Sequence, residues 1–313
     1  MKKKQKPQDG SGGPRLPRMS WAGFSRSLRL RMVVLFGGTA VLLFVAVGAL
    51  LVWRVSTVQR GTVMEMAGQI VDARSAEVRR WLEGHVQEVR GMSSLNVIRG
   101  ADVEEIAEYL EGRQGTFHPE HENVFFVDTR GQAVTSDGAR ADLSNRSYIQ
   151  EVLGGADYAI SNGLESAATG NAVVAVAHAV RTPRGDVAGV LGASVTLDSL
   201  SQLTRGMNFG EGGYGAVIGG DGVVMGHPNR AVVMNLNITN APDWPGMEAI
   251  GRGVTRGERG AEYFTNLRGL RHLGIFSPII GSPRWGVVYI LPIADLNAPV
   301  QELTGIITTI FLL

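Results

Sequence analysis

Cysteine is absent from the 313-residue chain. This excludes a disulfide framework, thiol catalysis and cysteine-based zinc sites, and it leaves the compartment undecided. Catalytic signatures are also missing, because the chain contains no Gly-x-Ser-x-Gly elbow, no His-Glu-x-x-His motif and no Walker loop. A membrane-bound hydrolase would therefore lack a nucleophile–base pair. We predict that this segment is not an enzyme and needs no cofactor; a cytoplasmic output domain outside it could be enzymatic.

Charge of either sign is missing from residues 32–53, MVVLFGGTAVLLFVAVGALLVW. As a helix these 22 residues would span roughly 33 Å, enough to cross the hydrocarbon core of a membrane. A cleaved signal peptide is the alternative, but its apolar region has roughly 7–15 residues and ends at a small-residue cleavage site, which Val52-Trp53-Arg54 is not. An uncleaved transmembrane helix is favoured.

Lysine occurs only within the first six residues, and residues 1–31 hold nine Lys or Arg against a single acid, Asp9. Such a tail could bind nucleic acid, but here it directly precedes the apolar segment. Because Lys and Arg concentrate on the cytoplasmic side of membrane helices, we predict a disordered basic cytoplasmic tail and no nucleic-acid partner. Residues 54–302 would then lie outside the cytoplasm, anchored in the inner (plasma) membrane.

The last eleven residues, LTGIITTIFLL, are apolar but would reach only about 16 Å as a helix, half the thickness of a membrane. We therefore expect residues 296–313 to be a helix entering a second, truncated transmembrane span. A large extracytoplasmic domain would lie between the two spans.

Residues 54–119 are predicted to form a helical stalk and connector. A stripe of apolar residues recurs at helical spacing, formed by Val71, Val78, Leu82, Val86, Val89 and Met92. An exposed apolar stripe of this length needs a partner, so we predict a parallel homodimer along this helix, although part of the stripe must cover the two modules. A second, short helix is expected at residues 101–111, capped by Asp102. From residue 120 the pattern indicates strands and turns, with brief helical connectors at most.

The strand pattern repeats itself. The segment VFFVDTRGQAVTSD parallels YGAVIGGDGVVMGHP, with Gly131 matched to Gly222 at an offset of 91, and Gly189 is matched to Gly286 at an offset of 97. Two similar offsets indicate two copies of one small module. We place the first at residues 120–205 and the second at residues 206–295.

A long helix followed by these two modules resembles the double Cache (dCache) sensor domains of bacterial chemoreceptors, sensor histidine kinases and diguanylate cyclases. The resemblance is carried by the hairpins VDTRGQAVTSD and IGGDGVVMGHP, and by DLSNRSYIQEVL, TGNAVVAVAHAV, GDVAGVLGASVTLDSL and WGVVYILP. It implies an α+β fold with a long N-terminal helix and two tandem PAS-like antiparallel-sheet modules, flanked by transmembrane helices. It also implies that the membrane-distal first module binds a small ligand.

Arg146 and Tyr148 stand where the family places an arginine for the ligand carboxylate and a neighbouring aromatic residue. The amino-acid binders of the family also carry a tyrosine and aspartates for the ammonium group. Leu164, Ser166 and Ser194 occupy those positions here. An uncompensated buried ammonium would be costly, so the resemblance favours a carboxylate or another anion over a standard α-amino acid.

Each candidate has a second interpretation. Arg146 could instead form an internal ion pair with Asp128, Asp142 or Glu165, and the Tyr148 ring could simply pack in the core. His178 interrupts an apolar strand, either as a core histidine or as part of the pocket lining. Further candidates for the ligand site are assigned by position alone: Tyr158, Glu165 and Ser194.

Residues 118–122, His-Pro-Glu-His-Glu, have side chains suited to a metal. Pro119 excludes the regular helix that would align the two histidines, so we interpret the segment as a solvated loop and predict no metal site.

The sequence therefore predicts extracytoplasmic sensing of a small molecule and transmembrane signalling, with chemotaxis or a related output. The alternative is a membrane-anchored dimerisation or protein-contact module without a small ligand.

Overall fold

The computed structural model describes residues 28–207, 212–294 and 305. The chain divides into two compact units, residues 1–57 with 303–313, and residues 58–302. Among the described residues one helical segment, Arg31–Leu50, is long and apolar enough to cross a membrane by length and composition. The predicted tail at residues 1–27 and, apart from Gly305, the predicted second span at residues 296–313 lie outside the described residues.

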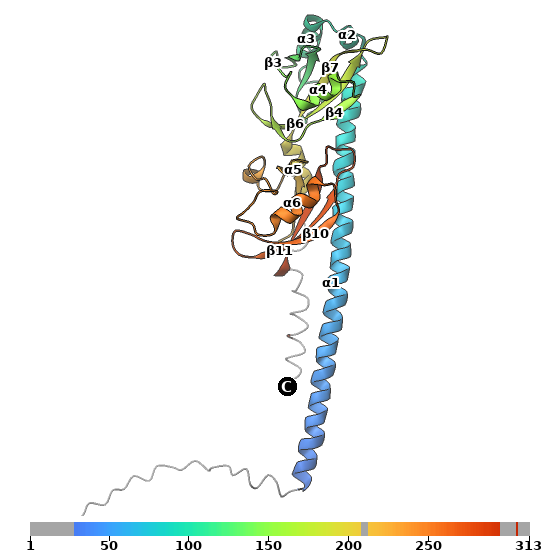
Figure 1. The fold of residues 1–313 in the computed structure, drawn as a ribbon. Coiled ribbons are helices and arrows are strands. Elements are labelled where there is room, and N and C mark those ends of the chain that lie inside the picture. The colour runs from blue at the N-terminus through green and yellow to red at the C-terminus, as the bar shows by residue number, and fades with distance from the viewer. Residues whose placement is uncertain (1–27, 208–211, 295–304, 306–313) are drawn as a thin grey trace, which may run out of the picture. The chain divides into compact units, whose positions relative to one another are not determined.

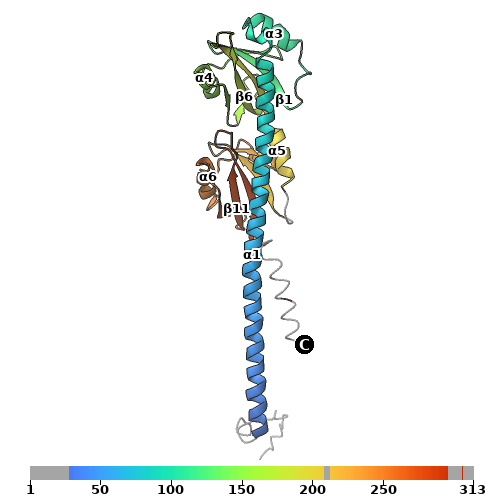
Figure 2. The ribbon, with the colours of Figure 1, turned by 90° about the vertical axis from the view of Figure 1, so that its right-hand side faces the viewer.

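Helix α1 runs from Leu28 to Ser93, and its C-terminal part lies along both modules of the second unit (Figures 1 and 2). The predicted apolar stripe is real, and five of its members are buried in the same core cluster as strands of both sheets: Val71, Val78, Leu82, Val86 and Val89. The stripe therefore packs on the chain's own modules. The expectation that part of the stripe covers the two modules is confirmed. The buried members are not available to a second copy, so the homodimer stays a prediction without their support.

Two short helices follow, α2 (Asn96–Arg99) and α3 (Val103–Glu111). The Asp102 carboxylate accepts hydrogen bonds from the backbone N–H groups of Glu104 (3.1 Å) and Glu105 (3.2 Å). These groups at a helix start have no partner within the helix, and an N-cap aspartate satisfies them. The predicted capped helix is confirmed.

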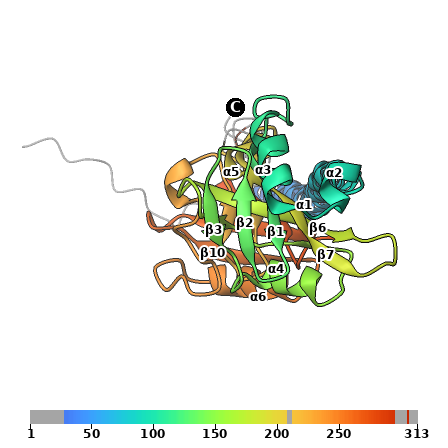
Figure 3. The ribbon, with the colours of Figure 1, turned by 90° about the horizontal axis from the view of Figure 1, so that it is seen from above.

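The first module is an antiparallel sheet in the order β3-β2-β1-β7-β6-β4, with β5 pairing β6. Its strands are β1 (His121–Asp128), β2 (Gln132–Thr135), β3 (Arg140–Asp142), β4 (Tyr158–Ile160), β5 (Leu164–Glu165), β6 (Ala172–Arg181) and β7 (Val187–Thr196). Helix α4 (Ser147–Leu153) covers one face, and α1 covers the other (Figure 3).

Strand pleating divides the first module's core into two clusters. On β6, Val174 and Val176 belong to the cluster on the α1 face, whereas Ala175 and Ala177 belong to the cluster on the α4 face. The α4 face carries the smaller side chains on this strand, and the pocket described below opens there.

The second module is an antiparallel sheet in the order β10-β11-β12-β8-β9. Its strands are β8 (Tyr214–Ile218), β9 (Val224–Gly226), β10 (Gly260–Thr265), β11 (Arg271–Pro278) and β12 (Gly286–Pro292). Helix α5 (Leu197–Arg205) connects the modules, and a 3-10 turn, η2 (Arg230–Val232), and helix α6 (Met247–Thr255) complete the second module.

Helix α6 contradicts the expectation that only brief helical connectors follow residue 120. Its sequence, MEAIGRGVT, holds two glycines, which are poor helix formers. A Cβ at Gly251 would lie 2.7 Å from the Ile238 carbonyl oxygen, and a Cβ at Gly253 would collide with the Phe276 ring. The glycines are required by close packing, which overrides their weak helix propensity.

The two matched hairpins use the same turn device. Gly131 between β1 and β2 has φ +86°, and Gly222 between β8 and β9 has φ +84°, a conformation that favours glycine. In the first hairpin the Asp128 carboxylate accepts hydrogen bonds from the backbone N–H groups of Arg130 (2.8 Å) and Gln132 (2.9 Å). Burial alone would raise the pKa of Asp128, but these bonds and the Arg130 charge outweigh it and lower the pKa.

Asn162, in the loop after β4, connects the two modules. Its side-chain oxygen accepts hydrogen bonds from the Gly220 N–H (3.0 Å) and from the indole N–H of Trp285 (3.0 Å), both in the second module. Trp285 is fully buried, so Asn162 supplies the partner that this N–H needs away from water.

Candidate functional site

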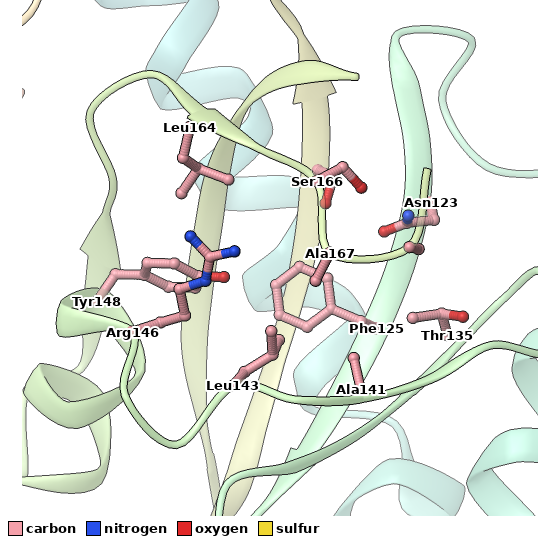
Figure 4. Close-up of a pocket in the computed structure, with 12 residues that line it drawn as sticks. Asn123, Phe125, Thr135, Ala141, Leu143, Arg146, Tyr148, Leu164, Ser166 and Ala167 are labelled. Carbon is pink, nitrogen blue, oxygen red and sulfur yellow. The ribbon is translucent and has the colours of Figure 1, made fainter. Parts of the chain in front are cut away.

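A small pocket lies on the α4 face of the first module, between the sheet and the loops around α4 and β5. It is lined by Asn123, Phe125, Thr135, Ala141, Leu143, Arg146, Tyr148, Leu164, Ser166, Ala167, Ala168 and Ser194. Figure 4 shows these side chains converging from β1, from the segment before α4 and from the segment around β5.

The pocket floor comes from the pairing of β1 with β7. Asn123 is opposite Ser194, and Phe125 is opposite Gly192. A Cβ at Gly192 would collide with the Phe125 ring, so this glycine leaves space for the ring over β7. The floor is therefore an aromatic ring with a polar amide and a hydroxyl beside it.

Arg146 is the N-cap residue of α4, with extended backbone, so its side chain leaves the helix start towards the pocket (Figure 4). The guanidinium Nη2 donates a hydrogen bond to the backbone carbonyl of Glu165 at 3.3 Å. No carboxylate among the described residues forms an ion pair with Arg146. The Glu165 side chain is exposed, and that residue contributes only its backbone to this contact.

The other two proposed ion-pair partners of Arg146 are engaged elsewhere. Asp128 pairs with Arg130 at 2.9 Å, and the Asp142 carboxylate accepts a hydrogen bond from the Ser144 N–H at 2.9 Å. Arg146 therefore keeps donors available for a ligand.

Tyr148, on the first turn of α4, is 5% exposed. Burial raises its pKa to about 12, although the Arg146 charge acts in the opposite direction. At neutral pH the phenol therefore keeps its proton and can donate a hydrogen bond to an anionic oxygen. Its hydroxyl lies at the same end of the pocket as the guanidinium (Figure 4).

Among the residues that the structure describes, no acidic side chain lines the pocket. One end holds the cationic Arg146 and the neutral hydroxyl of Tyr148, and the other offers the neutral polar groups of Asn123, Thr135 and Ser166 (Figure 4). The cavity has a volume of about 20 Å³, room for about one water molecule.

Of the six predicted site residues, the structure brings Arg146, Tyr148 and Ser194 together in the pocket and leaves the other three outside it. Tyr158 and His178 are opposite each other on β4 and β6, on the face that packs against α1. His178 Nδ1 lies 3.2 Å from the Ser93 hydroxyl of α1 and 3.0 Å from the Ala179 carbonyl. Tyr158 is 44% exposed and lines a surface hollow beside α1.

Sequence reasoning missed the pocket residues Asn123, Phe125 and Thr135. Asn123 gave a usable signal, since an amide at the head of the apolar run VFFV is unexpected in a buried strand, and it is 4% exposed. The other two are typical strand residues and gave none.

Residues 118–122 differ from the solvated loop expected from sequence. His121 is the first residue of β1, and its side chain is completely buried. It packs against His85 of α1, with 5.0 Å between the ring centres. The interpretation as a solvated loop was wrong for this histidine.

A long helix carrying two antiparallel-sheet modules, with a polar pocket in the first, defines a tandem-module sensor domain. The family model dCache_1, a Cache domain, matches residues 55–300. The chain therefore belongs to the Cache-domain family, of the double type.

Similar proteins are bacterial receptors. A methyl-accepting chemotaxis protein, PscA of Pseudomonas syringae pv. tomato, is 23% identical over 210 residues, which cover 65% of this chain and 32% of that protein. The chain thus spans about a third of the length of this curated relative.

Solved structures share the fold. The ligand-binding domain of the Pseudomonas fluorescens chemoreceptor CtaA in complex with L-serine matches with a TM-score of 0.56 and 18% identity, covering 74% of this chain and 96% of that chain. The Pseudomonas aeruginosa PAO1 amino acid chemoreceptor PctC, in complex with GABA, matches with a TM-score of 0.55 and 21% identity, covering 72% of this chain and 98% of that chain.

Proposed function

We propose that the first module binds a small carboxylate or another small anion outside the cytoplasm, and that α1 carries the resulting signal across the membrane. The observation that supports this most directly is Arg146. Its guanidinium faces the pocket, and among the described residues it donates a hydrogen bond to a backbone carbonyl and forms no ion pair with a carboxylate. Chemotaxis is the proposed output, because the curated relative is a methyl-accepting chemotaxis protein.

A ligand carboxylate would replace the Glu165 carbonyl as the partner of Arg146. A planar guanidinium can hold a carboxylate through two parallel hydrogen bonds, which a single carbonyl at 3.3 Å does not match. The protonated Tyr148 hydroxyl would donate a third bond. The neutral polar end with Asn123 and Ser166 suits a hydroxyl or a second polar group of the ligand.

An α-amino acid fits this pocket less well than a plain carboxylate. The related CtaA and PctC domains hold L-serine and GABA, and both ligands carry an ammonium group. The described lining offers that ammonium no carboxylate, and an unpaired charge in a partly enclosed pocket is costly. We therefore propose mono- or dicarboxylates as the ligand class.

Ligand entry would be coupled to a conformational change. Strand β5 has only two residues and pairs with β6 at Leu164↔Val173 and Glu165↔Ala172. A ligand that binds Arg146 would replace its hydrogen bond to the Glu165 carbonyl, which holds the segment around β5 to the start of α4. If this segment then moves away from the sheet, the small cavity becomes larger. The pocket floor is formed by β1 and β7, whose opposite face packs on α1, so the same sheet joins ligand and helix.

A second candidate function is a contact module without a small ligand, anchored in the membrane. The small volume of the cavity, about 20 Å³, favours it. The two candidates differ in whether any small molecule stabilises the chain through Arg146.

The test is a thermal-shift screen of the chain in detergent micelles against small mono- and dicarboxylates, α-amino acids, amines and purines. A ligand at 100 times its Kd adds about 2.7 kcal/mol of stability, which for a domain of this size raises Tm by about 5–10 °C. Arg146→Ala should weaken the hit by about 30-fold or more, because a bound charge loses its partner. The matched control is Arg140→Ala, an exposed arginine paired with Glu104.

Three results would count against parts of this proposal. A hit that stabilises wild type and Arg146→Ala equally would remove Arg146 from the site. Hits confined to α-amino acids would contradict the ligand class. The absence of any hit would favour the ligand-free module.

A further inference from the structure

Three imidazoles and a carboxylate converge near the start of β1. His85 and Glu88 come from α1, and His118 and His121 come from the segment that leads into β1; their candidate ligand atoms all lie within 4.8 Å of one another. The three imidazole ring centres are 5.0–5.4 Å apart. These histidines are half of the six in the protein, so their meeting requires an explanation.

Local backbone geometry brings each pair together. His85 and Glu88 are three residues apart on α1 and so share one face of the helix. The His121 N–H donates to the His118 carbonyl at 2.9 Å, and this turn around Pro119 places both rings beside α1. Pro119 prevents a regular helix here, but the turn from His118 to His121 brings these two histidine side chains to the same side instead.

The inner part of the cluster is dry. The side chain of His85 is 3% exposed and that of His121 is fully buried, while that of Glu88 is 33% exposed. The carboxylate edge therefore offers an entry path for an ion from solution.

The hydrogen bonds orient His85 as a metal ligand. Its Nε2 lies 3.0 Å from the Glu120 carboxylate, which also accepts a bond from the Trp81 indole N–H at 2.8 Å. A carboxylate only accepts, so Nε2 of His85 carries the proton and Nδ1 holds the lone pair. A histidine anchored in this way by a carboxylate is the usual support behind a metal-bound imidazole.

The lone pair of His85 Nδ1 faces another nitrogen, His121 Nε2, at 3.0 Å. The same His121 nitrogen lies 3.8 Å from the Glu88 carboxylate, and the other one, Nδ1, is buried without any hydrogen-bond partner. Because His85 Nδ1 holds a lone pair, His121 Nε2 carries the proton in the ion-free chain and donates it to His85. Binding of a cation would displace this proton, and the lone pairs of His85 Nδ1 and His121 Nε2 would then both be available to the ion.

We propose that His85, His118, His121 and Glu88 form a binding site for a divalent first-row transition metal ion, with Zn²⁺ as its preferred occupant. Three imidazoles and one carboxylate make a nitrogen–oxygen set that suits zinc and its neighbours, whereas Ca²⁺ and Mg²⁺ prefer oxygen ligands alone. Four ligands would complete a tetrahedral site of the structural kind.

Formation of the site needs only small side-chain movements. Ligand atoms about 2.0–2.1 Å from zinc lie roughly 3.3 Å from each other in a tetrahedron, and His85 Nδ1 and His121 Nε2 are already 3.0 Å apart. His118 Nδ1 accepts a bond from the Glu120 N–H at 3.2 Å, and coordination through that nitrogen would replace this bond.

The bound ion would join α1 to β1, the strand that also carries Asn123 and Phe125 of the pocket. It would therefore fix the helix against the first module. This proposal is independent of the ligand class proposed above, because none of the four metal ligands lines that pocket.

The test uses the full chain in detergent micelles, without a polyhistidine tag and freed of metal by dialysis against a chelator. Competition with a chromophoric zinc chelator should show one Zn²⁺ per chain with a Kd below about 10 μM. X-ray absorption of the zinc complex should show imidazole nitrogens at about 2.0 Å.

Substitutions of the two more exposed ligands, His118 and Glu88, provide a test even if variants of the buried His85 or His121 do not fold. His118→Ala and Glu88→Gln should each weaken zinc binding at least 10-fold, and Glu120→Gln should weaken it by about 10- to 100-fold as the support of His85. Glu83→Gln, on the same helix outside the cluster, and His227→Ala, in the second module, should leave it unchanged.

No saturable binding tighter than about 10 μM would overturn the proposal. Zinc binding that stays equally tight in both His118→Ala and Glu88→Gln would overturn it as well, and so would an absorption spectrum without imidazole ligands.

Discussion

The contact made by Asn162 should hold the two modules together, and Asn162→Ala tests this. One side-chain oxygen serves two donors, the Gly220 N–H and the Trp285 indole N–H, each at 3.0 Å. Alanine removes this acceptor and adds no new bulk, so both donors lose their partner in the folded chain.

The size of the effect depends on where each donor is left. The Trp285 indole is fully buried, so its N–H would stay unsatisfied at a cost of about 1–3 kcal/mol. Gly220 is partly exposed, so water can replace its partner at a smaller cost. Because 1 kcal/mol shifts Tm by about 2–4 °C in a domain of 150–250 residues, Asn162→Ala should lower Tm by about 2–12 °C.

The assay is differential scanning calorimetry of the chain in detergent micelles, with two controls. Asn162→Asp keeps an oxygen acceptor and should lose much less stability than Asn162→Ala. Asn235→Ala removes an exposed amide and should stay within about 0.5 kcal/mol of wild type. The reasoning is refuted if Asn162→Ala melts within 1 °C of wild type, or if the aspartate and alanine variants lose the same stability.

Two further predictions concern the first hairpin and the membrane topology. Gly131→Ala should lower Tm by clearly more than Gly185→Ala, measured by the same calorimetry: both glycines have positive φ, +86° and +94°, but a Cβ at Gly131 would collide with Ser144, whereas one at Gly185 meets open space. Positive φ alone costs a non-glycine residue about 1–2 kcal/mol, so equal losses would show that the Ser144 contact is unimportant. A phosphatase reporter that is active only outside the cytoplasm should be active when fused after Arg54 and after Glu302, because the basic residues precede the apolar helix. If instead only a second reporter, one that is active in the cytoplasm, gave activity at both positions, the proposed topology would be reversed.

Much of the architecture could be predicted from local patterns. The apolar stripe on α1, the Asp102 cap and the glycine turns of the two matched hairpins each depend on neighbours a few residues away. Such features follow from helix and strand periodicity and from the conformational freedom of glycine. Helix α6 was not predicted, because its two glycines are required by packing against residues distant in the sequence, and local helix propensity contains no information on that packing.

The candidate site was only half predictable for a similar reason. Arg146 and Tyr148 were assigned from the resemblance to the dCache family, but strand alternation shows only that His178 shares a face with its valine neighbours. Whether that face meets α1 or the pocket depends on which layer covers it. Tyr158 and His178 went to the α1 side, and Asn123 and Phe125 to the pocket, through the pairing of strands far apart in sequence.

The sequence alone therefore determined the anchor-like helix, the repeated module and the arginine at the start of α4, because each follows from a pattern of residues that are close together in the chain. Only the tertiary structure decided how much of the α1 stripe packs on the chain's own sheets and that His85 meets His121, 36 residues away. Contacts of this kind depend on the packing of whole faces against each other, and a local pattern specifies a face without specifying what will cover it.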